Sequence, residues 1–442
     1  MKDLYQKQRA MRAIRKAALQ RGVIGLLDIG SSKITCIVLQ FEEAPMRRSD
    51  DGVGSLAGQA DFRVIGAATT QSRGIRFGEI DSMSEAERAV RTVVAKAQKL
   101  AGVRLDHVIA CISGARPASY GLAGDIPLKT GKVTEGDVAS VLAACDVPDF
   151  GRGREVLHAQ PVNFAVDQRS GLGDPREHAG NRLACDMHVL TVSSDAIGNL
   201  VHCLRRCDLD LAGVASASYA AGRAALVEDE QELGAACIDL GGGSTGVSIF
   251  VRKHMIFADS IRMGGDLVTS DIAHGLRVPF AVAERLKTLN GGLEATGRDD
   301  REMIELDGDD MDGERRLVSR ADLIGIMRPR VEEILEEVRK VLDAAGFDYM
   351  PARQIVLTGG GSQIAGMDGL ASRMLGQTVR IGRPLRIDGL PHQMQHPGCA
   401  AAVGLALLAA HPQDEWWDFE VPAEAYPMRG LSWTYRWFRN NW

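Results

Sequence analysis

Two segments of the chain repeat one short pattern. Leu27-Asp-Ile-Gly-Ser-Ser-Lys-Ile-Thr-Cys-Ile-Val38 aligns without gaps on Ile238-Asp-Leu-Gly-Gly-Gly-Ser-Thr-Gly-Val-Ser-Ile249, so that Asp28 matches Asp239 and Gly30 matches Gly241. In each copy an apolar run ends at an aspartate, small residues follow, and a second apolar run rich in β-branched residues begins, which predicts a strand, a turn and a strand. The repeat predicts two similar halves, each presenting a hairpin to a shared cleft.

The rest of the chain alternates between expected strands and expected helices, which is typical of an α/β architecture. Helices are predicted at Glu85–Leu100 and Val331–Ala345, and further strands at His107–Ile112 and Gln354–Thr358. Residues 42–61 and 290–316 are predicted to be mobile loops. The second is acidic, but its spacing does not match the glycine and carboxylate positions of a calcium-binding EF-hand loop.

Composition limits the class of protein. The chain has 442 residues, of which 45% are hydrophobic and 25% charged, which fits a soluble globular protein with more than one domain. A net charge of −6 argues against a nucleic-acid binder that relies on bulk charge. We expect no membrane-spanning helix, because no apolar run reaches the roughly 20 residues needed. Eight cysteines, Cys203 and Cys207 beside His202 included, are interpreted as free thiols in a reducing cytoplasm rather than as a metal site.

The first repeated loop has the chemistry of a phosphate site. A turn of small residues exposes backbone N–H groups that can hold phosphate oxygens, and Gly30 allows a close approach. Ser31 and Ser32 add hydroxyl groups, and Lys33 supplies a positive charge for terminal phosphates. Asp28 ends the first strand, where a carboxylate can hold a water bound to Mg²⁺.

The second loop repeats this logic with more glycine, and a third loop accompanies the pair. Asp239 is placed to flank the metal opposite Asp28, and a triphosphate is expected between the two hairpins. The third loop follows a strand and is expected to open a helix containing Ile364 and to contact adenosine through bare backbone. The predicted residues of these two loops are Asp239, Gly241, Gly242, Gly243, Ser244 and Thr245, and then Gly359, Gly360, Gly361 and Ser362.

Other nucleotide motifs do not fit. Gly30 is followed by a β-branched strand, whereas a Rossmann Gly-x-Gly-x-x-Gly motif opens a helix. No Walker motif occurs. A single glycine loop is more often only a tight turn, but two aligned aspartate loops followed by a third glycine loop favour a nucleotide cleft.

These loops resemble those of the actin, sugar-kinase and Hsp70 superfamily, and the closer resemblance is to the FtsA family of bacterial cell-division actin homologues. The similarity runs from about Val23 to Ala410. Its most specific segments are 237–250, 264–273 and 355–367, followed by 380–384 and 402–405. It implies ATP and Mg²⁺ as ligands, and it implies that Glu284 and Lys287 contact ribose and adenine. From the residues alone, Glu284 and Lys287 would be a surface pair at i,i+3.

The resemblance also implies an actin-like two-domain fold with an inserted subdomain, 1C. The expected layout is a basic extension at 1–22, subdomain 1A at 23–106, 188–213 and 394–410, and subdomain 1C at 107–187. Subdomain 2A would take 214–264 and 331–393, and subdomain 2B would take 265–330. A linker at 411–427 and a terminal helix at 428–442 complete it.

Family partners are implied in the same way. The resemblance implies head-to-tail self-assembly at the division site, on the cytoplasmic face of the inner membrane. It also implies that the terminal peptide of the tubulin homologue FtsZ docks on 2B, with Arg328 and Arg330 as candidate contacts, and that other division proteins bind through 1C. Ordinary helix-surface charge is the alternative interpretation of these two arginines.

The C-terminal residues are predicted to form an amphipathic helix. Apolar side chains recur at spacings of three and four from Met428 onward, and no acidic residue interrupts the segment. A helix of this length, about 22 Å, is too short to cross a bilayer but fits an in-plane anchor. The expected membrane contacts are Leu431, Trp433, Tyr435, Arg436, Trp437, Phe438, Arg439 and Trp442. A helix docked on the body or on another subunit is the alternative.

Rapid hydrolysis is not expected. In kinases and chaperones of the superfamily, an acid or amide before the second hairpin orients the attacking water, but Ala212–Gly222 contains no Asp, Glu, Asn or Gln. No catalytic residue is therefore assigned, and slow or negligible turnover is predicted. A small-molecule kinase of the same superfamily and a pilus-assembly actin homologue remain alternatives.

Overall fold

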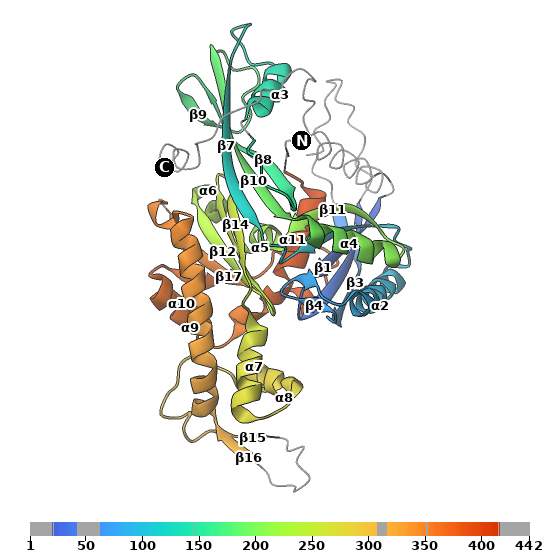
Figure 1. The fold of residues 1–442 in the computed structure, drawn as a ribbon, viewed down its shortest axis with the longest axis vertical. Helices are drawn as coiled ribbons and strands as arrows, with labels where there is room; N and C mark the ends of the chain where they lie inside the picture. Colours follow the sequence, from blue (N-terminus) through green and yellow to red (C-terminus); the bar gives the residue numbers. More distant parts are fainter. Residues whose placement is uncertain are drawn as a thin grey trace.

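The computed structural model describes residues 20, 22–41, 62–145, 147–306, 316–350, 352–413 and 415. The chain forms an elongated α/β molecule with two five-stranded sheets at its centre and a lobe at each end of the long axis (Figure 1). The predicted loop at 42–61 and the predicted helix at 428–442 lie outside the described residues, as do nearly all of the basic extension and most of the linker. No described helix is long and apolar enough to span a bilayer.

The first sheet contains the first copy of the repeat. Its strand order is β11-β6-β1-β2-β3, and β1 pairs antiparallel with β2 and parallel with β6. Because successive strand side chains point to opposite faces, Leu27 packs against helices α2 and α4 on one face, and Leu26 packs against α5 and α11 on the other. We call this the first domain; its elements are β1 (Val23–Ile29), β2 (Lys33–Phe41), β3 (Phe62–Gln71), β4 (Ile75–Arg76), β5 (Glu79–Ile80), α2 (Met83–Ala101), β6 (His107–Ile112), α4 (Ser194–Arg206), β11 (Asp210–Ser216) and α11 (Ala400–Ala410).

The second sheet repeats the arrangement around the second copy. Its order is β14-β13-β12-β17-β18, with β12 antiparallel to β13 and parallel to β17. Phe250 faces α5, and Ile249 faces the core shared with α9 and α10. We call this the second domain; its elements are α5 (Ala217–Ala225), α6 (Glu228–Leu233), β12 (Ala235–Leu240), β13 (Thr245–Val251), β14 (His254–Ile261), β17 (Gln354–Thr358), α10 (Met367–Leu375) and β18 (Val379–Ile381). The prediction of two similar halves is confirmed.

Helices α5 and α11 pack against each other between the two sheets. Tyr219 on α5 is 1% exposed, and every residue of α5 apart from Arg223 is buried. Gly404 on α11 lies so close to the backbone of Ala220 that an added Cβ would meet its Cα at 3.0 Å and its carbonyl oxygen closer still. The two domains are therefore joined by a contact that only glycine permits.

An inserted unit forms the lobe at the top of Figure 1. Its sheet, in the order β7-β10-β8-β9, consists of β7 (Ala118–Pro127), β8 (Arg154–Val166), β9 (Arg169–Leu172) and β10 (Arg182–Ser193), and it packs with α3 (Glu135–Ala144). The inserted unit was expected to start at residue 107, but the structure places residues 107–112 in the first sheet. Strand β6 pairs with β1 and β11 inside the first sheet, so the inserted unit begins after Ile112.

The lower lobe in Figure 1 contains α7 (Gly265–Leu276), α8 (Phe280–Asn290), β15 (Met303–Leu306), β16 (Arg316–Ser319) and the first turns of α9 (Arg320–Ala344). In this lobe the structure differs from two expectations. Residues 290–316 were expected to form one loop, but β15 and β16 pair as a hairpin on either side of the undescribed residues 307–315. Helix α9 begins eleven residues before the expected Val331, because Ser319 caps it by accepting a hydrogen bond from the Asp322 N–H.

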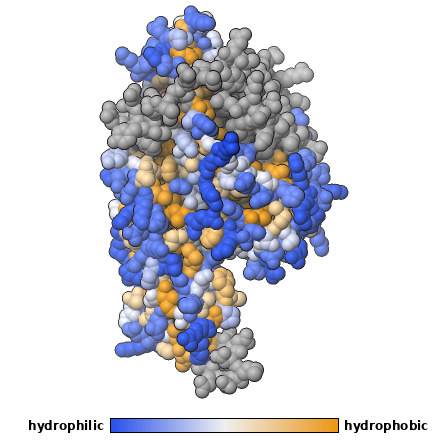
Figure 2. Space-filling model, viewed as in Figure 1, coloured by the Kyte–Doolittle hydropathy of each residue, from blue (hydrophilic) through white to orange (hydrophobic). Residues whose placement is uncertain are grey.

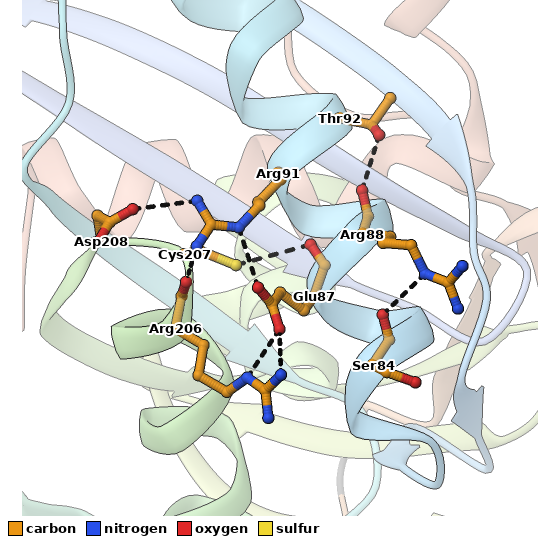
Figure 3. A network of polar contacts seen from close by, with 8 residues as sticks. All are labelled: Ser84, Glu87, Arg88, Arg91, Thr92, Arg206, Cys207 and Asp208. Atoms are coloured by element: carbon orange, nitrogen blue, oxygen red, sulfur yellow. Dashed lines mark hydrogen bonds and ion pairs between the residues drawn. The ribbon is translucent and has the colours of Figure 1, made fainter.

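Polar contacts join α2 to α4 on the outer face of the first domain (Figure 3). Glu87 on α2 accepts hydrogen bonds from Arg91 at 3.1 Å and from Arg206 on α4 at 2.7 Å. These arginine donors, Arg91 first, lower the pKa of Glu87. Cys207 is buried beside them with its Sγ 3.7 Å from the Glu87 carbonyl oxygen, and Cys203 is buried as well. Both thiols thus belong to the packing between these helices.

Candidate functional site

A cavity of about 650 Å³ lies between the two domains and is bordered by all three glycine loops. It receives side chains or backbone from both sheets at the ends of β1, β12 and β17. Most of the predicted residues line it: Asp28, Gly30, Ser31, Ser32, Lys33, Asp239, Gly241, Gly242, Gly243, Ser244, Glu284, Lys287, Gly359, Gly360 and Gly361. The fold therefore brings together residues more than 300 positions apart in the sequence.

The two hairpin loops have the same local geometry. The Gly30 N–H donates to the Lys33 carbonyl at 3.1 Å, and the Gly241 N–H donates to the Ser244 carbonyl at 3.0 Å. Each bond closes a tight turn directly after the aspartate-bearing strand. The remaining backbone N–H groups of such turns form a concavity suited to anions.

The loops touch each other across the cleft. A Cβ added to Gly242 would lie 2.8 Å from the Cβ of Ser32, and one added to Gly243 would lie 2.7 Å from the Cβ of Ser31. Only glycine leaves room for this approach, which accounts for the glycine enrichment of the second loop. The two domains are thus closed on each other at the level of the predicted phosphate site.

Asp28 and Asp239 face the cavity from opposite domains. Burial and then the charge of Asp28 raise the pKa of Asp239 to about 7. Burial also raises the pKa of Asp28, opposed by a hydrogen bond from the Cys111 thiol at 3.1 Å and by the charge of Lys33. Two carboxylates that repel each other in a partly enclosed space form a site that favours a cation.

This pair fits the expected Mg²⁺. Mg²⁺ is usually held by one or two carboxylates, several waters and substrate phosphates rather than by a cage of protein ligands. Asp28 and Asp239 would supply the carboxylates, and the open cavity leaves space for waters and phosphate oxygens. Among the described residues, no group of three or more His, Cys, Asp or Glu side chains is placed to hold a metal ion.

Lys33 is a cation whose charge lowers the pKa of both aspartates. Its Nζ donates to the Sγ of Cys399 at 3.4 Å. Cys399 lies at the start of α11 and also contacts the His396 ring at 3.4 Å. A thiol is a weak acceptor, so a phosphate oxygen could replace it at small cost.

The third loop follows β17 and borders the cavity with Gly359, Gly360 and Gly361. Gly359 has a φ of 82°, and a Cβ there would lie 2.7 Å from the carbonyl carbon of Leu240. Gly360–Gln363 form a 3-10 turn, and α10 begins only at Met367. Ile364 follows that 3-10 turn directly and precedes α10, so its expected place inside a helix is corrected, although the strand and the turn were predicted correctly.

Glu284 and Lys287 form a polar wall on α8. The Lys287 Nζ lies 2.6 Å from Glu284 Oε2 and 3.0 Å from the Gly265 carbonyl oxygen. Both side chains line the cavity while pairing at i,i+3. The pair is therefore part of the cleft and not only a surface contact.

Thr245 and Ser362 were predicted to bind and do not line the cavity. Both are buried, with their hydroxyls donating to the carbonyls of Met263 at 2.8 Å and Gly359 at 2.8 Å. These hydrogen bonds stabilise the two loops on the side away from the cavity.

The two arginines predicted to contact a partner lie on α9, away from the cavity. Arg328 pairs with Glu332 at 2.7 Å, and Arg330 pairs with Asp271 at 2.6 Å. The predicted membrane contacts at 431–442 lie outside the described residues.

Several lining residues were missed by sequence reasoning. Ser113 follows β6 and Ser218 lies on α5, where no glycine pattern marks them. Asp266 at the start of α7 could have been noticed within the segment Gly264-Gly-Asp. The other missed residues come from several loops and helices and include Thr288, Arg320, Gln363, His396, Gly398 and Ala401.

Comparisons with known proteins show the family of this chain. A family model described as "Cell division protein FtsA" matches residues 236–404, and a model described as "SHS2 domain inserted in FTSA" matches residues 114–191. The second range overlaps the expected span of 107–187 for the inserted unit. It begins just after β6 and ends within β10.

Full-length relatives carry the same name. "Cell division protein FtsA" of Agrobacterium fabrum is 37% identical over 404 residues, covering 91% of this chain and 89% of the relative. The protein of that name from Pseudomonas aeruginosa is 29% identical, covering 93% and 95%. That of Escherichia coli is 28% identical, covering 88% and 90%.

Solved structures show the fold. The chain resembles a structure of the PilM–PilN type IV pilus biogenesis complex with a TM-score of 0.57 at 17% identity, covering 88% of this chain and 99% of that one. It also resembles MreB 5 of Spiroplasma citri bound to AMPPNP, with a TM-score of 0.51 at 14% identity, covering 87% and 95%. With its two matching domains, its inserted SHS2 unit and these near full-length relatives, the chain belongs to the FtsA family of actin-like cell division proteins.

Proposed function

We propose that this cell division protein binds ATP with Mg²⁺ in the cleft between its two domains. The observation that carries the proposal is the pair of Asp28 and Asp239, which face each other across a cavity bordered by three glycine loops. The hairpin N–H groups and Lys33 would hold the phosphates, and the two aspartates would hold Mg²⁺ through its waters. The bound Mg²⁺ would neutralise part of the polyphosphate charge.

The remaining residues would position the nucleoside. The backbone of the third glycine loop, Gly359–Gly361, would lie against adenosine. Glu284 and Lys287 would contact the ribose and the base. Turnover should be slow, because Ser218 is the polar side chain that α5 brings to the cavity and a hydroxyl cannot act as a strong base. Steady-state phosphate release checks this, and rapid release by the pure protein would contradict it.

In this proposal the ATP-bound protein assembles head to tail and tethers FtsZ filaments to the inner face of the cytoplasmic membrane. Other division proteins would bind through the inserted unit. The predicted helix at 428–442 would supply the membrane contact. One such helix binds weakly, whereas anchors linked in a polymer gain about 10²–10⁴ in avidity.

The lower lobe offers a surface for the FtsZ peptide. Apolar side chains reach solvent there, and Figure 2 shows hydrophobic patches on this lobe. Arg328 lies on α9 in the same lobe, exposed and paired with Glu332. A peptide with apolar and acidic residues would match this combination. Exposed apolar residues of this lobe outside the cavity include Phe280 (49% exposed), Met303 (52%) and Leu317 (59%).

Liposome co-sedimentation tests the tether. With ATP and anionic vesicles, the full chain should pellet and should carry FtsZ filaments with it. A chain ending at Ala425 should stay in the supernatant, because it lacks the predicted anchor. The charge reversal Arg328→Glu should keep the lipid pelleting and reduce the FtsZ that accompanies it. Equal pelleting of the full and shortened chains would remove the anchor from the proposal.

A further inference from the structure

A short hairpin of the first domain reaches both phosphate loops. Phe77 and Gly78 form the turn between β4 and β5, with φ values of 51° and 74°. The Gly78 N–H donates to Ser31 Oγ at 2.9 Å. A Cβ added to Gly243 would lie 3.0 Å from the Phe77 nitrogen. The turn is therefore packed against the point where the two domains meet.

Arg262 extends from the second domain to this hairpin. It follows the last residue of β14, and its Cζ lies 4.8 Å from the centroid of the Phe77 ring. Its Nη1 lies 3.8 Å from Glu79 Oε1, the carboxylate on the other side of the turn. Since Arg262 is half-exposed, the ion pair adds little, and the attraction between the cation and the ring carries more of the contact.

Glu79 joins this contact to the inserted unit. The same oxygen, Oε1, accepts a hydrogen bond from the Ala115 N–H at 3.2 Å. Ala115 stands at the entry to the inserted unit, and its carbonyl accepts the Ser193 N–H at 2.8 Å, at the exit from that unit. Ala115 is thus hydrogen-bonded to Glu79 at the entry to the inserted unit and to Ser193 at the exit from it.

The backbone at this junction is strained. Ala115 is fully buried with a φ of 71°, and Arg116 follows with a φ of 50°. Together with Phe77, three non-glycine residues in one contact network adopt the left-handed conformation. Such residues cost free energy and persist where their surroundings hold them, often at switch regions. Glu79 and Ser193 are the groups that hold Ala115.

We propose that the contacts among Arg262, Phe77 and Glu79 form a latch between the two domains. This latch couples closure of the nucleotide cleft to the position of the inserted unit on the first domain. When the two phosphate loops separate, Arg262 must leave both the ring and the carboxylate. Glu79 then loses a partner, and its hold on the strained Ala115 weakens. Arg262 and Glu79 act here as positioning residues, since neither lines the cavity. The link to nucleotide rests on the proposed function, whereas the chain of contacts does not.

Hydrogen exchange of the nucleotide-free full chain tests the coupling. Arg262→Ala should speed exchange of the Ala115 and Ser193 amides about fivefold, because it removes a contact of about 1 kcal/mol. Arg76→Ala is a matched control, since Arg76 lies 5.1 Å above the same ring but belongs to the same hairpin and does not cross the cleft. It should leave both amides unchanged. Equal exchange in Arg262→Ala and the wild type would overturn the latch.

Release of a fluorescent ATP analogue is the second readout. We expect about fivefold faster release from Arg262→Ala, and also from Phe77→Leu, which removes the aromatic ring and keeps the arginine. Arg76→Ala should release it at the wild-type rate. If the wild type binds no analogue, the proposed function fails and hydrogen exchange still decides the latch. If it binds, and release from Arg262→Ala matches Arg76→Ala, the latch is wrong.

Discussion

At the scale of single residues, the site depends on two carboxylates whose charged forms are disfavoured by burial. Asp28 and Asp239 end matching strands on opposite domains, and their mutual repulsion is offset in part by Lys33 and, at Asp28, by the Cys111 thiol. Removing one of the two carboxylate charges should therefore stabilise the protein and, at the same time, weaken ligand binding. This trade is typical of binding sites whose ligand supplies the missing counter-charge.

Asp239→Asn should show both effects. The folded protein raises the pKa of Asp239 from 3.8 to about 7, so the charged form is disfavoured and wild-type stability falls as pH rises through this range. Without nucleotide or Mg²⁺, the variant should be more stable than the wild type at pH 8, by about 1–2 kcal/mol, because the carboxyl keeps some exposure to the cavity. The advantage should shrink toward pH 5. The variant should also lose MgATP binding.

Thermal unfolding between pH 5 and pH 8 measures this difference. Asp348→Asn, which removes an exposed carboxylate away from the cavity, is the control and should not change the slope with pH. A wild type and an Asp239→Asn variant that melt with the same pH dependence would show that the carboxyl is not held at a cost.

At the scale of elements, the sequence predicted what lies close together along the chain. The paired hairpins, β17 and its glycine turn followed from apolar runs that end at glycine or aspartate. The start of α9 was missed, because Gly325 and Pro329, both weak helix formers, interrupt the stretch that follows the capping Ser319. The role of β6 was missed for another reason. Its strand pattern was read correctly, but its place in the first sheet depends on pairing with β1 and β11, which are distant in sequence.

The contact between α5 and α11 gives a sharp element-level prediction. Gly404→Ala should destabilise the protein by about 2–4 kcal/mol, because the added methyl group overlaps the Ala220 backbone between two helices that are almost entirely buried. Gly198→Ala on α4 is the matched control, since nothing lies within 4 Å of its added Cβ. It should stabilise α4 by about 0.5–1 kcal/mol. Urea unfolding compares the two, and equal midpoints would show that the helices can separate freely.

At the scale of the whole molecule, two similar domains close on one cavity, and lobes at opposite ends present different surfaces. The sequence alone predicted the cleft through its repeat, but it did not predict the hairpin at Phe77 or the neighbours Asp266 and His396. No periodic pattern marks these residues. Packing of distant elements brings Asp266 and His396 to the cavity and the Phe77 hairpin against the second phosphate loop.

The central claim is that MgATP binds between the aspartate loops, and a calorimetric titration tests it most directly. The full chain is titrated with ATP, with and without Mg²⁺, beside the variants Asp28→Asn and Asp239→Asn. We predict one nucleotide per chain, tighter binding with Mg²⁺, and loss of the Mg²⁺ effect in both variants. No saturable binding, or binding in which Mg²⁺ and the two aspartates make no difference, would contradict the account.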